Sequence, residues 1–341
     1  MILPGTADWY VACESTELGN DPRRIDLFDT PLVFFRPESG PVGALLDNCP
    51  HRGAPLSLGK VTSGLIECAY HGWSFSSTGV CQRVPGLIGH DYPKSYHAVA
   101  YPVVEQDGYI WVFGEPVEHS PGSPPRIPLH DDPDYLTVRE GADIAASVFD
   151  VAENVLDVPH TAFLHGGLFR SDRATTPRRV VVTRSSRSVE AEYFDEQSLS
   201  PFVTKLLTSG QTIQHVDRFI PPATLQVEYR FGPKNHLLVI SHCTPTSPHR
   251  TRLFATIRLK SVVPHLFLKL ILRPIFRKIL RQDTVMLEAQ TANTIKTGQS
   301  TYRLSEIDIL SPHIKSLMLA HQEGIQPEEP VESVKTLQLG L

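Results

Sequence analysis

Short apolar runs separated by turn residues fill the first third of the chain. The runs are rich in β-branched and aromatic residues, show no helical period, and fall within 31–35, 41–48, 64–70 and 101–113. Runs of this kind, bounded by Gly, Pro, Asn and Asp, are typical of strands. The next stretch, 114–135, is rich in Pro, Gly and Asp, which sustain neither helix nor sheet. The pattern predicts a small all-β domain over 1–118 and a linker over 119–135.

After the linker the apolar pattern changes. Residues 146–165 have helical spacing as far as Pro159, and a second helical pattern covers 264–297. Between these helices lie roughly six runs typical of an antiparallel sheet, at 178–186, 188–194, 212–220, 223–232, 236–245 and 251–260. The order helix, strands, helix predicts an α+β domain over 136–325. The acidic, Pro-containing end, 326–341, is predicted to be a tail without a fold of its own.

Composition narrows the class of protein. With 341 residues, 41% of them apolar, the chain is long enough for two domains that each have a core. A net charge of −5 and a pI near 6.3 give no broad positive field, so nucleic acid is not an expected partner. No basic segment precedes an apolar core at the N-terminus, and no run reaches the roughly 18 apolar residues of a spanning helix. We therefore expect a cytoplasmic protein whose five cysteines form no disulfide framework.

Two Cys/His pairs define the first candidate metal site. Cys49 and His51 form one pair, and Cys68 and His71 form the other. A structural zinc site would also accept two Cys and two His, so the ligand count does not identify the metal. Zinc fingers usually group Cys with Cys and His with His, whereas each short loop here offers one thiolate and one imidazole. This arrangement favours a Rieske [2Fe-2S] cluster, in which one iron takes both sulfurs and the other both nitrogens.

His160 and His165 define a second candidate metal site. Ferrous iron that activates O₂ typically binds two His and one carboxylate, so a carboxylate from elsewhere in the chain would complete this site. On a regular helix the two side chains would point about 140° apart and could not share a metal. Joint ligation therefore requires the helix to break or bulge between them, and Pro159 makes such a departure plausible.

In both places the sequence resembles the Rieske non-haem iron oxygenases. CPHRGAPLSLG (49–59) and CAYHGWSFSSTG (68–79) closely resemble the cluster-binding loops of that family. ENVLDVPHTAFLH (153–165) resembles its Asn, Asp, His, His signature, and RQDTVMLEAQ (281–290) resembles the segment that carries its last iron ligand. The resemblance begins at ADWYVAC (7–13), and the chain length fits the compact monooxygenase group that includes the vanillate and dicamba O-demethylases. It implies an α+β fold with an N-terminal all-β Rieske domain, followed by a helix-grip (START-like) catalytic domain with an antiparallel sheet.

The resemblance also assigns roles at the cluster. It implies that Cys49 and Cys68 hold the inner iron, and that His51 and His71 hold the outer, more exposed one. Asp157 is implied to pass electrons to the mononuclear iron from a cluster in a neighbouring subunit, where it would contact that subunit's copy of His71. A head-to-tail ring of subunits, usually a trimer, follows from this arrangement.

For the mononuclear iron the resemblance implies three ligands, His160, His165 and Asp283. Glu288, five positions after Asp283, is the alternative carboxylate. Asn154 belongs to the same signature as the two histidines, and we expect it in the catalytic site. The cofactors are then the [2Fe-2S] cluster and one Fe(II).

The activity implied is that of an oxygenase component. Electrons from NAD(P)H would reach the cluster through a flavin reductase, a ferredoxin or both. The protein would use them with O₂ to hydroxylate or demethylate an aromatic or other small hydrophobic molecule. One alternative is a Rieske electron-transfer protein, which would show no substrate-dependent O₂ consumption. Another is a zinc-stabilised module that carries a lipophile, which would be colourless.

Two further features concern partners and substrate. Basic residues at intervals of four predict an amphipathic helix with a basic stripe, namely Lys269, Arg273, Arg277 and Arg281. A solvated face is the first expectation for this stripe, before docking of an acidic ferredoxin or contact with a membrane. Candidate pocket residues lie on two predicted strands: Phe231, Asn235, His236, Leu238, Ile240 and His242. Among them Asn235 and His242 are the candidates for substrate contact. His242 could donate a hydrogen bond to a polar group, although a satisfied core histidine is the first expectation for it.

Overall fold

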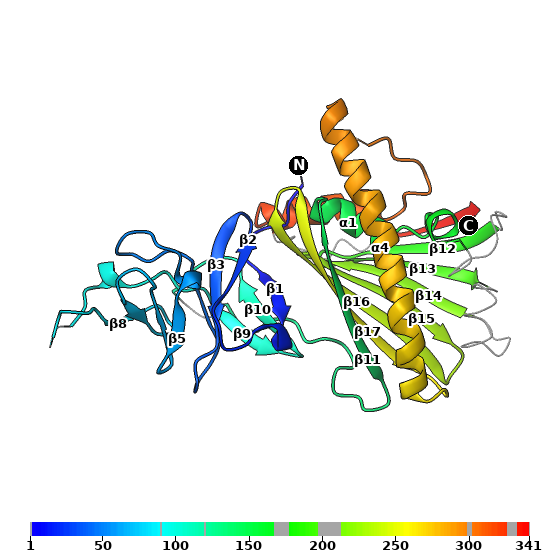
Figure 1. Ribbon diagram of the computed structural model, residues 1–341. Coiled ribbons are helices and arrows are strands. Elements are labelled where there is room, and N and C mark those ends of the chain that lie inside the picture. Colours follow the sequence, from blue (N-terminus) through cyan, green and yellow to red (C-terminus); the bar gives the residue numbers. More distant parts are fainter. Residues whose placement is uncertain are drawn as a thin grey trace. The chain divides into compact units, whose positions relative to one another are not determined.

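The computed structural model describes residues 2–88, 91–118, 121–166, 177–196, 213–298, 302–325 and 333–340 (Figure 1). The chain divides into two compact units. One unit is Thr6–Ile127, and the other is Pro128–Leu341 together with Met1–Gly5. The boundary after Ile127 falls inside the segment predicted to be the linker. The backbone N–H of Gly5 donates to His321 Nδ1 at 3.2 Å, which ties the first residues to the second unit.

The first unit consists of short antiparallel strands in small sheets. Their orders are β1-β10-β9, β2-β3-β4 and β5-β6-β7-β8. The strands are β1 Trp9–Glu14, β2 Arg23–Leu27, β3 Thr30–Phe35, β4 Gly43–Leu46, β5 Lys60–Thr62, β6 Leu65–Glu67, β7 Ser74–Phe75, β8 Cys81–Arg83, β9 Val103–Gln106 and β10 Tyr109–Phe113. Short 3₁₀ turns lie at Ser15–Glu17, Leu56–Leu58 and Lys94–Tyr96. The prediction of an all-β first domain is confirmed.

Strand β3 is buried on both faces. Leu32 and Phe34 pack in an apolar cluster with residues of β1 and β10, while Val33 and Phe35 pack in a second cluster. The second cluster also contains the cysteines of both Cys/His loops. A strand with two buried faces needs an apolar residue at every position, which explains the uninterrupted run in the sequence. The second cluster therefore packs against the base of both Cys/His loops.

The second unit contains one large antiparallel sheet of eight strands, ordered β11-β17-β16-β15-β14-β13-β12-β18. The strands are β11 Leu136–Ile144, β12 Pro177–Arg184, β13 Val189–Glu196, β14 Ile213–Ile220, β15 Thr224–Phe231, β16 Asn235–Ser247, β17 Arg250–Lys260 and β18 Ser333–Gly340. The six predicted strands correspond to β12 through β17, and β11 and β18 extend the sheet at its two edges. Each strand pairs antiparallel with its neighbours.

Strand β18 corrects the prediction made for the end of the chain. The segment 326–341 is predicted to be a tail, but Ser333–Gly340 pairs with β12 in antiparallel register. The prediction is wrong for these residues because it follows the Glu and Pro content of the preceding stretch. The run VKTLQL after that stretch contains the β-branched residues Val334 and Thr336 and two leucines, and it lacks Gly and Pro, as a strand does.

Four helices of the second unit are described: α1 Val148–Val155, α2 Thr161–Leu164, α4 His265–Thr297 and α5 Ser311–Gln322. Figure 1 shows α4 lying across the strands of the sheet. Its side chains Leu268, Leu272 and Phe276 pack on apolar residues of β11, β15, β16 and β17. Helices α1 and α5 pack together in the other main core cluster of this unit. An antiparallel sheet covered by a long helix confirms the predicted helix-grip fold.

The basic stripe of α4 lies partly against the sheet. Arg273 Nε and Arg277 Nε both donate to the carboxylate of Glu140 on β11, at 2.5 and 2.9 Å. Two of the four basic residues therefore have an acidic partner within the same unit. All four are exposed, in agreement with a solvated face. Among the helices of the described ranges, none is both long enough and apolar enough to cross a lipid bilayer.

Candidate metal centres

The two Cys/His loops form the same turn. The N–H of Cys49 donates to the carbonyl five residues later (2.9 Å), and the N–H of Gly53 donates to the carbonyl of Cys49 (2.8 Å). The second loop repeats both bonds, from Cys68 (2.8 Å) and from Gly72 (3.0 Å). Gly53 and Gly72 have φ of 72° and 70°, a conformation that glycine adopts without strain. Each loop therefore presents its cysteine and its histidine in an equivalent way.

The thiols of these loops lie inside and the imidazoles outside. Cys49 and Cys68 are 2% and 3% exposed, whereas His51 is half-buried and His71 is exposed. Burial, together with the adjacent Cys68, raises the pKa of the Cys49 thiol to about 11. The His51 and His71 rings lie 4.6 Å apart, and His51 stacks on Trp73 at 4.8 Å. Two adjacent buried thiols beneath two adjacent imidazoles fit the donor set of a Rieske cluster.

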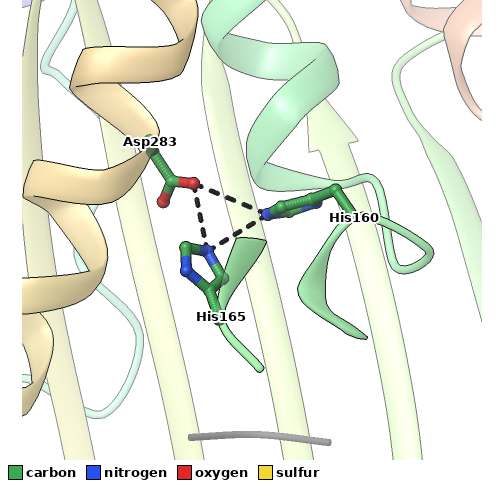
Figure 2. A group of neighbouring side chains, drawn as sticks. All are labelled: His160, His165 and Asp283. Atoms are coloured by element: carbon green, nitrogen blue, oxygen red, sulfur yellow. Dashed lines mark hydrogen bonds and ion pairs between the residues drawn. The ribbon is translucent and has the colours of Figure 1, made fainter. Parts of the chain in front are cut away.

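Three side chains of the second unit form another donor set (Figure 2). His165 Nε2 lies 3.2 Å from His160 Nε2 and 3.0 Å from Asp283 Oδ1, and the remaining distance, from His160 Nε2 to Asp283 Oδ1, is 3.6 Å. Asp283 Oδ1 is buried and accepts no well-oriented hydrogen bond from the described residues. Two imidazoles and one carboxylate that converge on one point are the set that ferrous iron uses in non-haem oxygenases, so the three residues fit the metal.

Helix α2 explains how the two histidines converge. It contains a single turn, with His160 at its N-cap and His165 at its C-cap. His165 has φ −107° and ψ 26°, outside the helical repeat. The expected departure from a regular helix therefore occurs where α2 ends, and it brings together two rings that an unbroken helix would hold apart. Asp283 comes from the opposite side, on α4.

Two further side chains orient the imidazoles. Gln282 Oε1 accepts from His165 Nδ1 at 3.1 Å, while its own Nε2 donates to the carbonyl of Leu164 at 3.0 Å. On the other ring, Asp157 Oδ2 lies 3.4 Å from His160 Nδ1 and accepts from the His160 backbone N–H at 3.1 Å. Contacts at Nδ1 leave each Nε2 directed at the common centre, as metal-ligating histidines require.

Neighbouring groups of opposite charge shift the pKa values of His160 and Asp283. Burial alone would lower the pKa of His160, but Asp157 and Asp283 raise it to about 9. For Asp283 burial acts to raise the pKa, and the interactions with His160 and His165 outweigh it, so that the net shift is downward. An ionised carboxylate is thereby available at neutral pH as a hard oxygen donor.

Beside the three donors lies a cavity of about 130 Å³. His160, His165 and Asp283 form one part of its wall, and apolar side chains of α4 and of strands β15 to β17 form most of the rest. A separate cleft of about 560 Å³ also has His160 in its wall, together with Asn154 and Asp157. A metal bound by the three residues would therefore border the apolar chamber, while His160 and Asp157 line both cavities.

Family comparisons agree with both centres. Residues 8–93 match the Rieske [2Fe-2S] domain, and residues 144–318 match the vanillate O-demethylase oxygenase C-terminal domain. The second match covers half of the chain and contains all three donors. The chain belongs to the vanillate O-demethylase oxygenase family. Its first unit is thus a Rieske domain, and its second unit is the catalytic domain of this family.

Individual relatives in the family point the same way. The dicamba O-demethylase oxygenase component of Stenotrophomonas maltophilia is 36% identical over 51% of this chain and 51% of its own length. The vanillate O-demethylase oxygenase subunit of Pseudomonas sp. (strain HR199 / DSM 7063) is 30% identical over 68% of this chain and 63% of its own. Chlorophyllide a oxygenase of Chlamydomonas reinhardtii is 29% identical over 86% of this chain but only 44% of its own. The matches thus span between 44% and 63% of the length of these relatives.

A solved structure of dicamba monooxygenase bound to 3,6-dichlorosalicylic acid matches over 93% of this chain and 97% of that one. The TM-score is 0.79 and the sequence identity 25%. The similarity therefore extends through both units of this chain and bears out the predicted order of a Rieske domain followed by a helix-grip domain.

Three other predicted site residues, Glu288, Asn235 and His242, do not belong to the donor set. Glu288 Oε1 accepts from the N–H of Ala145 at 3.2 Å, so Asp283 is the carboxylate that the fold brings to the histidines. Asn235 and His242 do not line the cavity beside the donors. Asn235 Oδ1 accepts from the N–H of Val262 at 3.3 Å, and the Nδ1 of His242 lies 3.0 Å from Thr224 Oγ1.

The phase of strand β16 explains the position of His242. Leu237, Val239 and Ser241 line the cavity, and successive side chains of a strand point to opposite faces. His242 therefore lies on the face of the sheet away from the cavity. Sequence reasoning also missed three polar residues near the donors, Gln282, His215 and Asp217. A visible signal existed for the last two, since they occupy positions of β14 that are otherwise apolar, between Ile213 and Phe219.

Proposed function

We propose that this chain is the oxygenase component of a Rieske-type monooxygenase, which hydroxylates or demethylates an aromatic or other small hydrophobic molecule. The observation that carries the proposal is the position of His160, His165 and Asp283 in the wall of an apolar cavity. The same chain carries the Rieske loops that would supply electrons. The names of the relatives, which include dicamba and vanillate O-demethylases, support an aromatic substrate.

The cofactors and the protein would divide the chemistry between them. When bound, the cluster supplies single electrons and the ferrous ion activates O₂, so that one oxygen atom enters a substrate C–H bond and the other leaves as water. The protein's own part is to position and to exclude water. Leu237, Val239 and Phe276 line the cavity with apolar surface, which favours a hydrophobic substrate over solvent next to the donors. Gln282 and Asp157 hold the two imidazoles in fixed orientations.

We propose that Asp157 acts in electron transfer between subunits. Its side chain is 31% exposed, borders the larger cleft and contacts His160 at the same time. A cluster histidine from a neighbouring copy of the chain, His71, could reach Asp157 through this cleft. We infer a head-to-tail trimer in which each cluster serves the iron of the next subunit, supplied by a ferredoxin, a flavin reductase or both.

The test replaces the carboxylate donor. Asp283→Ala is expected to lower the iron content of the loaded protein from about three to about two Fe per chain, because the mononuclear site loses a ligand while the cluster keeps all four of its own. NADH-linked oxygen uptake with methoxyarenes, N-methyl compounds and polycyclic hydrocarbons should fall to background. The visible spectrum of the cluster should not change.

Glu288→Ala is the matched control, since it removes a carboxylate from the same helix that binds only a backbone N–H in the described structure. It should retain both iron content and oxygen uptake. If Asp283→Ala kept substrate-dependent uptake, or if the wild-type chain consumed no oxygen with any hydrophobic substrate while its cluster still cycled, the oxygenase proposal would give way to a Rieske electron carrier.

A further inference from the structure

A buried polar pair interrupts the apolar wall of the cavity. His215 and Asp217 lie on strand β14, line the cavity that the metal donors also border, and are each 1% exposed. Both face the same side of the sheet as the buried Ile213 and Phe219, because residues two apart on a strand share a face. Two polar side chains thus occupy positions that the fold would otherwise fill with apolar ones.

The pair is held firmly in place. The Nε2–H of His215 donates to Asp217 Oδ1 at 3.0 Å. The His215 ring is stacked between Tyr193 and Tyr229, with ring centroids 4.6 and 4.1 Å away and interplanar angles of 18° and 16°. These tyrosines are its register partners on β13 and β15. The imidazole therefore fixes the position of the Asp217 carboxylate in the cavity wall.

Stability does not account for this arrangement. A buried ion pair is weak as a source of folding energy, and apolar residues of similar volume often stabilise a protein as well or better. An ionised carboxylate also has about four acceptor positions, of which His215 occupies one. The position of this acceptor, in the wall of a cavity next to the metal donors, points to a ligand.

The charges around the cavity limit what this ligand can be. Its ionisable lining residues in the described part of the chain are three histidines, Tyr229 and the acids Asp157, Asp217 and Asp283, with no Lys or Arg. An anionic substrate group near Asp217 would meet a like charge, with no Lys or Arg among these residues to pair with it. The cavity volume, about 130 Å³, is comparable to that of an engineered protein cavity that binds benzene, so a single ring is the appropriate size of probe.

We propose that Asp217, positioned by His215, accepts a hydrogen bond from the substrate, so that the cavity selects a ring compound bearing a hydroxyl or N–H group over an aromatic carboxylate. This selectivity rests on the proposed oxygenase function.

Binding of two probes to the iron-loaded protein, measured by calorimetry without O₂, tests the proposal. The probes are 4-methylphenol and 4-methylbenzoate, which differ in the polar group. Wild-type protein should bind the phenol more tightly than the benzoate. Asp217→Asn should weaken phenol binding about tenfold, because it removes a charged acceptor, and should not weaken benzoate binding. Direct coordination of a probe to iron is common to both proteins and cancels in this comparison.

Glu228→Gln is the matched control. Glu228 forms the same kind of pair with His236, at 2.9 Å, but it alternates with the cavity-lining Val227 and Tyr229 and so lies on the other face of the sheet. This variant should change the affinity for either probe less than twofold. If Asp217→Asn does not fold, His215→Gln provides the second variant: it loosens the carboxylate and should reduce the preference for the phenol at least threefold.

Tighter binding of the benzoate to the wild type, or an unchanged preference in Asp217→Asn, would overturn the assignment. Oxygen uptake is measured separately on the same preparations. If the protein prefers the phenol through Asp217 but never consumes oxygen, the binding site stands and the proposed oxygenase function is wrong. If oxygen uptake depends on Asp283 but the preference is unchanged in Asp217→Asn, the oxygenase function stands and the binding site is wrong.

Discussion

Gln282 supports the metal site without being one of its ligands. It accepts from His165 Nδ1 and donates to the Leu164 carbonyl, so it links the ring to the last residue of α2. The amide thereby sets both the tautomer of the imidazole and the direction of its Nε2. Residues in this position typically affect metal affinity almost as much as the ligands they orient.

Gln282→Leu should therefore weaken binding of ferrous iron by about 10–100-fold, because His165 loses the acceptor that orients it. Titration of the metal-free second site with Fe(II), followed by the iron content after gel filtration, measures the change. The cluster spectrum should be unaltered. Gln290→Leu is the control: it removes a hydrogen bond to Tyr302 from the same helix, two turns further on, and should bind iron like the wild type. Equal affinities for the two variants would contradict the role given to Gln282.

At the scale of elements, helix α4 has a buried side and an exposed side that differ sharply. Leu268 is fully buried against the sheet, whereas Leu270, two residues later, is 70% exposed. The two positions point in different directions because each helical residue turns the side chain by about 100°. The sheet therefore holds the helix through one stripe of residues, and the same helix carries Gln282 and Asp283.

Leu268→Ala should destabilise the second unit by about 2–4 kcal/mol, since the substitution leaves a cavity in a packed core. Leu270→Ala should change stability by less than about 0.5 kcal/mol. Urea unfolding followed at 222 nm reports on this unit, because all the described α-helices belong to it. The three tryptophans, Trp9, Trp73 and Trp111, all lie in the Rieske domain, and their fluorescence serves as an internal reference. Similar losses in both variants would mean that α4 is not held through this stripe.

For the whole molecule, one buried histidine predicts how stability responds to acid. Burial of His242 lowers its pKa to about 4, whereas an exposed imidazole titrates near 6.5. Between these two values the unfolded chain binds a proton that the folded chain does not. The contribution of His242 to stability is therefore complete above about pH 6.5 and decreases as the pH falls toward 4.

Between pH 7 and pH 4, the free energy of unfolding should fall by roughly 2–3 kcal/mol less in His242→Gln than in the wild type. This is the difference that a pKa shift of this size produces. Urea unfolding at 222 nm across this range measures the difference between the two proteins. The comparison is between slopes, so a constant loss of stability in the variant does not affect it. His249→Gln replaces an exposed histidine and should follow the wild-type slope. Parallel slopes for His242→Gln and the wild type would contradict the prediction.

The sequence predicted those parts of the molecule whose chemistry is local. Both Cys/His loops and the His160–His165 pair lie in short segments with informative spacing, and β12 to β17 follow from runs of apolar and β-branched residues. The pocket could not be predicted in the same way, because a shift of one residue in the phase of a strand exchanges its two faces. His242 was assigned to the wrong face for this reason. Gln282 was missed because its partner, His165, lies 117 residues away along the chain.

Helix α4 joins two tasks in one piece of backbone. Phe276 forms part of the chamber wall, and Asp283 follows it by seven residues, about 10 Å further along the axis. A guest molecule that presses on Phe276 pushes the same helix that carries the carboxylate. The wall of the chamber and the carboxylate of the donor set therefore share one length of helix, which fixes the spacing between Phe276 and Asp283.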